Sequence, residues 1–244
     1  MEVHHHPNVE KKGFKEYFLE FIMIFLAVTM GFFAESIREN ISNNEHAKLL
    51  TNQLVAGLKA DTLNLQTAIK FEQLHQRTID TLYFALQEPL ASADTKTIQQ
   101  LIANSYSLKL FNPTTGAISA IEKELNIKQF AVSELPALIA VYENSININK
   151  QRENLLFRLL EENLESFFYT HFTPSNAYSI FKKDSLIADG KIRNLTQEDM
   201  EAFSVKIEIL NAVISSLIHS DEDLKSKAVS LIQYVTNTYN LKND

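Results

Sequence analysis

The stretch that decides the fold is Tyr17–Ile37, YFLEFIMIFLAVTMGFFAESI, an almost uninterrupted apolar run near the start of the 244-residue chain. As a helix rising about 1.5 Å per residue, it is about 31 Å long, which matches the hydrocarbon core of a lipid bilayer. We therefore predict a transmembrane helix over residues 17–37. A short tip, residues 1–16, and a body, residues 42–244, would then lie on opposite sides of the membrane.

The charges beside the run predict its orientation. Basic residues before a span mark its cytoplasmic side. We therefore expect the tip in the cytoplasm and the body outside it, which in a bacterium with two membranes means a span in the inner membrane and a body in the periplasm. The flanking residues are basic before the run and mainly acidic after it: Lys11, Lys12 and Lys15, then Glu35, Arg38, Glu39 and Glu45.

A cleaved signal peptide is the alternative interpretation of the run. Signal peptidase requires small residues at its cleavage site, whereas the end of the run places Phe32 and Phe33 before Ala34. The sequence therefore favours an uncleaved anchor.

One acidic residue, Glu20, lies within the predicted span. A carboxylate in hydrocarbon costs about 2.5–3.5 kcal/mol at the helix centre and less near an end, so Glu20 could reach the interface or stay protonated. The alternative is contact with a polar group of a partner helix, aided by Ala27 and Gly31, which are small residues four apart.

Three consecutive histidines, His4–His6, lie in the tip. Neutral imidazole is a good ligand for transition metals, but three adjacent positions rarely converge on one ion. The simpler interpretation is a solvated tail.

The opening segment EVHHHPNVEKKGFKEYFLEFIMIFLAVTMGFFAESIREN resembles the start of a family of uncharacterised bacterial proteins that have one N-terminal span and a helical body. The likeness is close over about the first forty residues and extends to the rest only in pattern. It implies topology and no activity, cofactor or site residue.

Composition excludes several classes of function. With five Gly and five Pro, the chain has few places where regular structure must break, so we predict an all-α protein. It contains no cysteine, which excludes disulfides and thiolate metal sites. Its net charge of -7 argues against a nucleic-acid partner, because phosphates would repel an acidic protein.

The body has the pattern of one domain, an antiparallel bundle of long helices. Apolar residues recur at three- and four-residue steps, which predicts amphipathic helices. Within the first of them, Gly57 is interpreted as a site of close packing. The predicted helices are Ser42–Gln87, either new or continuous with the span; a short helix after Asp94; one from Asn112 and Pro113; Ser133–Tyr169, with Pro136 in its first turn; and helices starting at Thr196 with Asp199 and at Ser220 with Asp223.

Two features interrupt these stripes. Between Ile146 and Leu155 the apolar face turns polar, which suggests a kink, an exposed end or a buried polar cluster. Aromatic residues gather between Phe167 and Phe181, where we expect the closed end of a bundle rather than a ligand pocket.

Catalytic and metal-binding patterns are weak. Glu72 and His75 have the Glu-x-x-His spacing of di-iron bundles, but such sites need a second pair and two more carboxylates. Zincin, nucleophile-elbow and phosphate-loop motifs are absent from the sequence. We therefore expect no cofactor, no bound metal and no enzymatic activity.

These observations predict a membrane-anchored helical protein with a structural or interaction role. Its partners would be the bilayer and another envelope protein or a second copy of itself. The alternative is a sensor-like module that holds a small ligand between its helices.

Overall fold

The computed structural model describes residues 13–125, 127–131, 133–176, 178 and 192–241. Their regular secondary structure is entirely helical, and no strand occurs among them. The prediction of an all-α protein with long helices is therefore confirmed. The chain divides into two compact units, Met1–Leu49 and Leu50–Asp244.

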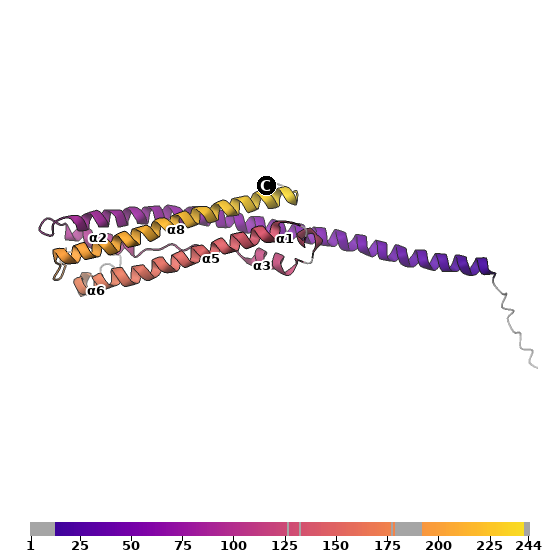
Figure 1. The fold of residues 1–244 in the computed structure, drawn as a ribbon, viewed down its shortest axis with the longest axis horizontal. Helices are drawn as coiled ribbons and strands as arrows, with labels where there is room; N and C mark the ends of the chain where they lie inside the picture. The colour runs from indigo at the N-terminus through magenta and orange to yellow at the C-terminus, as the bar shows by residue number, and fades with distance from the viewer. Residues whose placement is uncertain (1–12, 126, 132, 177, 179–191, 242–244) are drawn as a thin grey trace, which may run out of the picture. The chain divides into compact units, whose positions relative to one another are not determined.

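Helix α1, Phe14–Gln87, is the longest element, with 74 residues (Figure 1). It includes both the apolar run and the helix predicted from Ser42, so no new helix starts there. Proline, which would remove a backbone donor and break the helix, is absent from α1.

The remaining helices follow in the second unit. Segment η1 is a π-helix, and because α5, η1 and α6 follow one another directly, they form one helical run close to the predicted Ser133–Tyr169. Pro136 lies in the first turn of this run, as expected. The elements are α2, Thr95–Ser105; α3, Gly116–Lys123; α4, Lys128–Ala131; α5, Leu135–Leu159; η1, Leu160–Glu165; α6, Ser166–His171; and α8, Gln197–Thr238.

Two predicted helix starts are confirmed by their caps. The Asp94 carboxylate accepts hydrogen bonds from the backbone N–H groups of Lys96 and Thr97, both at 3.2 Å, and so caps α2. Thr196 and Asp199 form a capping box at the start of α8, in which each side chain accepts a bond from the other residue's backbone N–H.

Two other predicted starts are wrong. Helix α3 begins at Gly116 rather than at Pro113, because the backbone N–H of Thr114 donates to Asp61 on α1 at 2.9 Å and holds the segment before α3 to that helix. Helix α8 continues through Ser220, whose hydroxyl accepts a bond from Arg152 at 3.0 Å instead of capping a new helix.

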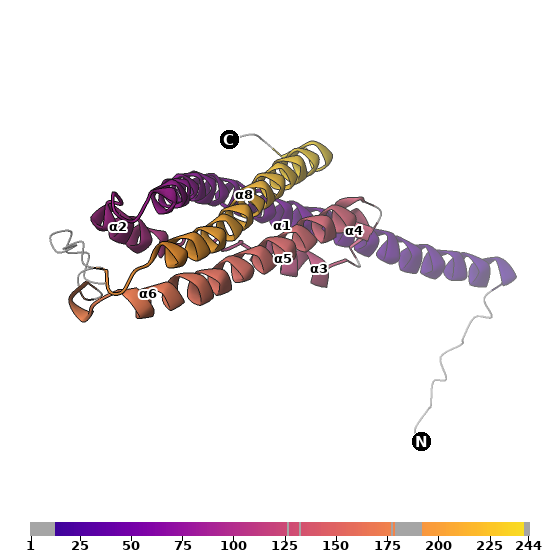
Figure 2. The same ribbon diagram turned by 60° about the vertical axis from the view of Figure 1, so that its left-hand side comes forward.

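Helices α5 and α8 lie side by side in both ribbon views (Figures 1 and 2). Lys227 donates to Ser145 at 2.8 Å, and Arg152 donates to Ser216 at 3.0 Å. Because the residue number rises along α5 as it falls along α8, these two helices are antiparallel.

Helices α1 and α5 run in the same direction. Tyr142 donates to Asp61 at 2.9 Å, and eleven residues further along each helix the charge of Glu153 acts on Glu72. The segment 88–134, which carries α2, α3 and α4, must therefore return the chain from the end of α1 to the start of α5.

Stacked aromatic rings fill the core where α6 meets α8. The rings of Phe167 and Phe203 are stacked with centroids 3.9 Å apart, and those of Phe168 and Phe172 with centroids 4.7 Å apart. All four side chains are buried, so this part of the predicted aromatic cluster is packed core. Phe181 lies outside the described residues.

A close approach joins α1 to the segment before α3. A Cβ atom on Gly57 would lie 3.2 Å from Thr114 Cγ2, so the interpretation of Gly57 as a site of close packing is confirmed. One helical turn away, Asp61 is fully buried and accepts bonds from both Thr114 and Tyr142.

We predict that Tyr142→Phe lowers the free energy of unfolding by about 1–3 kcal/mol, because it leaves the buried Asp61 carboxylate without one of its donors. Urea unfolding of the purified protein measures the change. Tyr169→Phe is the matched control, since Tyr169 is 73% exposed. Equal loss in both variants, or no loss in either, would contradict the role given to this bond.

Candidate functional site

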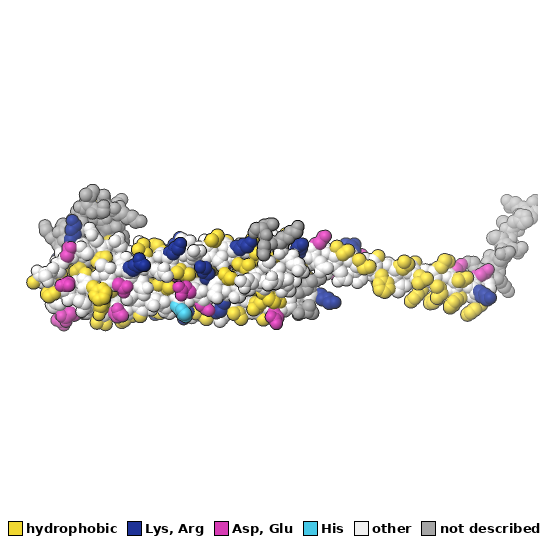
Figure 3. All heavy atoms as spheres, turned by 90° about the horizontal axis from the view of Figure 1, so that it is seen from above, with side chains coloured by type: hydrophobic (Ala, Val, Ile, Leu, Met, Phe, Trp, Pro, Cys, Tyr) yellow, Lys and Arg dark blue, Asp and Glu magenta, His cyan; other side chains and the backbone are white. Residues whose placement is uncertain are grey.

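The part of α1 that belongs to the first unit exposes apolar side chains on all its faces. An eighteen-residue window near the N-terminal end of α1 has a mean hydropathy of 2.0, and none of it is buried. Hydrophobic side chains stand out along this part of the helix in the space-filling view (Figure 3). Such a surface is unfavourable in water and suits a helix surrounded by lipid.

Helix α8 is also long and apolar enough to cross a membrane, with a window of mean hydropathy 1.3, but 33% of that window is buried. Phe203, Leu210 and Leu217 are among its apolar side chains in the core of the second unit. Helix α8 therefore has the character of a core helix, in contrast to the apolar part of α1.

The predicted partner-helix residues lie on one face of α1. Ala27 and Gly31 follow Glu20 by seven and eleven positions, which in a helix of 3.6 residues per turn places all three within a narrow sector. Ala27 and Gly31 are exposed, Glu20 is half-buried, and a Cβ atom on Gly31 would meet nothing within 4 Å. No neighbour among the described residues therefore requires glycine there.

The structure describes only some of the charged residues that flank the apolar run. Lys15 is exposed, whereas Lys11, Lys12 and His4–His6 lie outside the described residues. After the run, Arg38 Nε donates to Glu35 at 3.0 Å, so the cation that follows the run is balanced by a carboxylate.

The second unit contains a buried acidic cluster, which we define as Glu72 of α1, Glu153 of α5 and Asp221 of α8. These side chains are 4%, 6% and 1% exposed. Glu153 lies in the polar interruption between Ile146 and Leu155, so of the three interpretations of that interruption, the structure supports the buried polar cluster.

Each member of the buried acidic cluster has a different set of partners. Glu153 accepts a bond from the backbone N–H of Phe111 at 2.8 Å, and Asp221 accepts one from the Asn149 side-chain amide. Glu72 and Asp221 are hydrogen-bonded to each other through their carboxyl groups.

The pKa values of this cluster are shifted upward. Burial, with the neighbouring charges of Asp221 and Glu153, raises the pKa of Glu72 to about 8. Burial also raises the pKa of Asp221 to about 6, although the Asn149 bond opposes this shift. The pKa of Glu153 is raised by burial against the opposing bond from Phe111.

Glu72 and His75 do not combine into a metal site. His75 is buried, and its Nε2 atom lies 3.0 Å from the backbone carbonyl of Ser105, whereas Glu72 is bonded to Asp221. No three or more His, Cys, Asp or Glu side chains are arranged so that they could hold a metal ion in the part of the chain that the structure describes.

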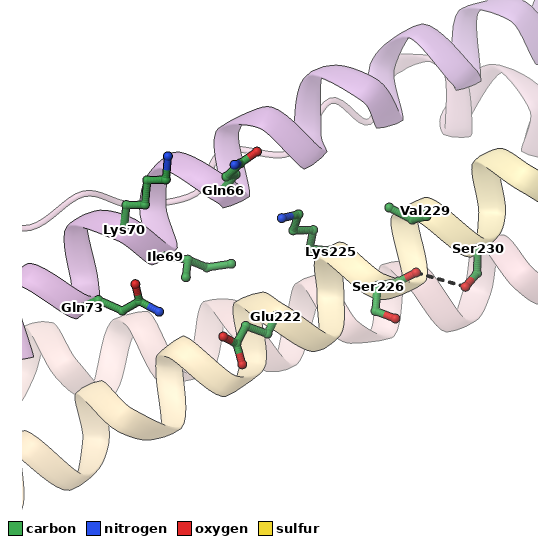
Figure 4. A pocket seen from close by; sticks show the side chains of 9 residues that line it. All are labelled: Gln66, Ile69, Lys70, Gln73, Glu222, Lys225, Ser226, Val229 and Ser230. Atoms are coloured by element: carbon green, nitrogen blue, oxygen red, sulfur yellow. Dashed lines mark hydrogen bonds between the residues drawn. The ribbon is translucent and has the colours of Figure 1, made fainter. Parts of the chain in front are cut away.

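A groove of about 520 Å³ lies between α1 and α8 (Figure 4). Lys225 extends from α8 toward α1 across it, and Lys70 lines the facing side. Neither ammonium group is joined by an ion pair or hydrogen bond to another described residue. The groove thus has two cationic groups against the one carboxylate of Glu222. Its other lining residues are Gln66, Ile69, Gln73, Glu222, Ser226, Val229 and Ser230.

Sequence reasoning found Glu72 but paired it with His75, and it gave Asp221 no role. Asp221 directly follows Ser220, the residue predicted to start a new helix. The sequence did indicate that Asp221 is buried, because it lies four residues after Leu217 and three before Leu224, within the apolar stripe of α8.

Comparison of the chain with protein-family models, with curated proteins and with solved structures gives no match. The geometry of the apolar segment, the buried acidic cluster and the groove is thus the basis for assigning a function.

Proposed function

We propose that this protein is a single-span membrane protein of the bacterial envelope, anchored by residues 17–37, with a non-catalytic interaction role. The observation that carries this proposal is the apolar part of α1, in which an eighteen-residue window is long and apolar enough to cross a bilayer and has no buried residue.

The proposed orientation places the tip in the cytoplasm and the body in the periplasm. The positive-inside rule counts basic residues near each end of a span. Lys11, Lys12 and Lys15 lie within six residues before the apolar run, whereas Arg38 and Lys48 are spread over the eleven residues after it.

The interaction role is supported by a surface feature of the first unit. Glu20, Ala27 and Gly31 form one face of the proposed span, where a second helix could approach closely. We expect the partner to be another envelope protein or a second copy of the chain.

A second candidate function, binding of a small ligand, is supported by the groove between α1 and α8. Lys70 and Lys225 supply two cationic groups there, and Gln66, Gln73 and Ser226 supply hydrogen-bond donors, whereas the Ser230 hydroxyl already donates to the Ser226 carbonyl. The ligand class that fits this lining is a small anion.

Replacing Leu26 and Val28 together with Arg should remove the protein from the membrane fraction, because each Arg costs about 2.5–3.5 kcal/mol at the centre of a span. Carbonate-washed membranes, probed by immunoblot, give the measurement. The matched control replaces Leu63 and Leu74, which lie on the same helix and are 66% and 62% exposed, and should stay in the membrane. Retention of the Leu26/Val28 variant would overturn the anchor.

The orientation can be tested with single cysteines, since the chain has none of its own. Glu201→Cys, on the exposed face of α8, should react with a membrane-impermeant maleimide added to spheroplasts. Gly13→Cys should react only after lysis. The reverse pattern would place the body in the cytoplasm.

Gly31→Leu should weaken association of the span, because the larger side chain prevents close approach of a second helix. Affinity purification from mild detergent, with identification of co-purifying proteins and sizing of the complex, compares it with the wild type. Phe33→Leu, on another face of the helix, is the control and should retain the wild-type complex. An unchanged complex in Gly31→Leu would exclude this face as the interface.

A further inference from the structure

The Glu72 and Asp221 carboxyl groups meet without a cation to neutralise them. Each has one buried oxygen, Glu72 Oε2 and Asp221 Oδ2, that lacks a hydrogen-bond donor among the described residues, yet the two side chains are bonded to each other. Two ionised carboxylates cannot donate to each other. A proton shared between them satisfies both oxygens.

The charged and titratable groups around the pair come from all three packed helices. On α1, His75 is kept neutral near pH 7, because burial lowers its pKa, and it is bonded to Ser105. On α5, Lys150 acts on Glu153, and Arg152 is bonded to Ser216 and Ser220. No ion pair from these groups reaches Glu72 or Asp221 in the described ranges. Of these groups, Glu153 acts by its charge on both Glu72 and Asp221. Glu222 and Lys225 line the groove beside the pair.

We propose that Glu72 and Asp221 form a proton-binding site that holds α1 against α8, and that loss of the shared proton loosens the contact between these two helices. An unpaired second charge at the buried site would be strongly unfavourable, so ionisation must admit water or separate the carboxyl groups. The groove lies at the same level of α1 and α8 as the pair, because its lining residues Gln73 and Glu222 are the sequence neighbours of Glu72 and Asp221 (Figure 4).

The direction of the pH effect follows from the pKa shifts. Burial raises the pKa of Glu72 from 4.5 to about 8, so the folded protein holds this proton more tightly than the unfolded chain does. The stabilisation is complete below the ordinary pKa of 4.5 and is lost as the pH rises through about 8. The cap hydrogen bonds lower the pKa values of Asp94 and Asp199, so these two groups change the free energy of unfolding only at acid pH.

This inference concerns the second unit and holds whether or not α1 crosses a membrane. Under the function proposed above, with the body in the periplasm, the site would follow the pH outside the cell. A detergent-purified full chain tests the proton site without testing the anchor, so failure of one proposal is distinguishable from failure of the other.

The experiment follows urea unfolding and hydrogen exchange of the full chain from about pH 5 to about pH 8.5. For the wild type, the unfolding constant should rise by up to about tenfold per pH unit for each proton released, and the protection of amides from exchange, relative to the intrinsic rate at each pH, should fall in residues 66–76 and 217–226. Glu72→Gln keeps an amide donor for Asp221 and should lose most of this pH dependence. Glu201→Gln, which is exposed, should behave as the wild type.

A wild-type protein without pH dependence in this range, or a Glu72→Gln variant that keeps the full wild-type dependence, overturns the proposal. Should Glu72→Gln fail to fold, Asp221→Asn takes its place. The shared proton can also be detected directly in the wild type. Its infrared spectrum at about pH 7 should contain the band of a protonated carboxylic acid that disappears by about pH 9. Absence of that band overturns the site.

Discussion

Apolar side chains on every face of a helix are unfavourable in water, and α1 carries such a surface in one part of its length. Between Phe14 and Ile41 its large apolar residues are exposed in every direction. From Leu50 to Leu86 the buried apolar residues form one stripe, although Leu63, Leu74 and Phe84 stay exposed. One continuous helix thus has two kinds of surface: the first part is apolar all round, and the second takes part in a core with α5 and α8.

The sequence was most informative where structure depends on near neighbours. The caps at Asp94 and at Thr196 with Asp199 could be predicted, because a side chain and the N–H groups it bonds lie within three residues. The starts predicted at Pro113 and Ser220 were wrong for the opposite reason, since bonds to distant Asp61 and Arg152 decided the structure there.

The buried acidic cluster was hard to predict for the same reason, since its members are distant in the sequence. The polar interruption of α5 was visible in the sequence, and a buried cluster was one of its three interpretations. Its partners could not be identified, because Glu72 and Asp221 are 149 positions apart and meet only through the packing of α1 with α8. The cluster also accounts for the polar residues that interrupt otherwise apolar stripes: they replace hydrophobic contacts with a bond that depends on a proton.

The π-helical segment Leu160–Glu165 has an evolutionary consequence. Its i→i+5 bonds take up about one residue more per turn than an α-helix does, so one extra residue is absorbed within the segment. A one-residue deletion there would convert the π turn into an α turn and leave Phe167 and Phe168 of α6 in their places in the core. The segment can therefore change its length by one residue without changing the aromatic packing that follows it.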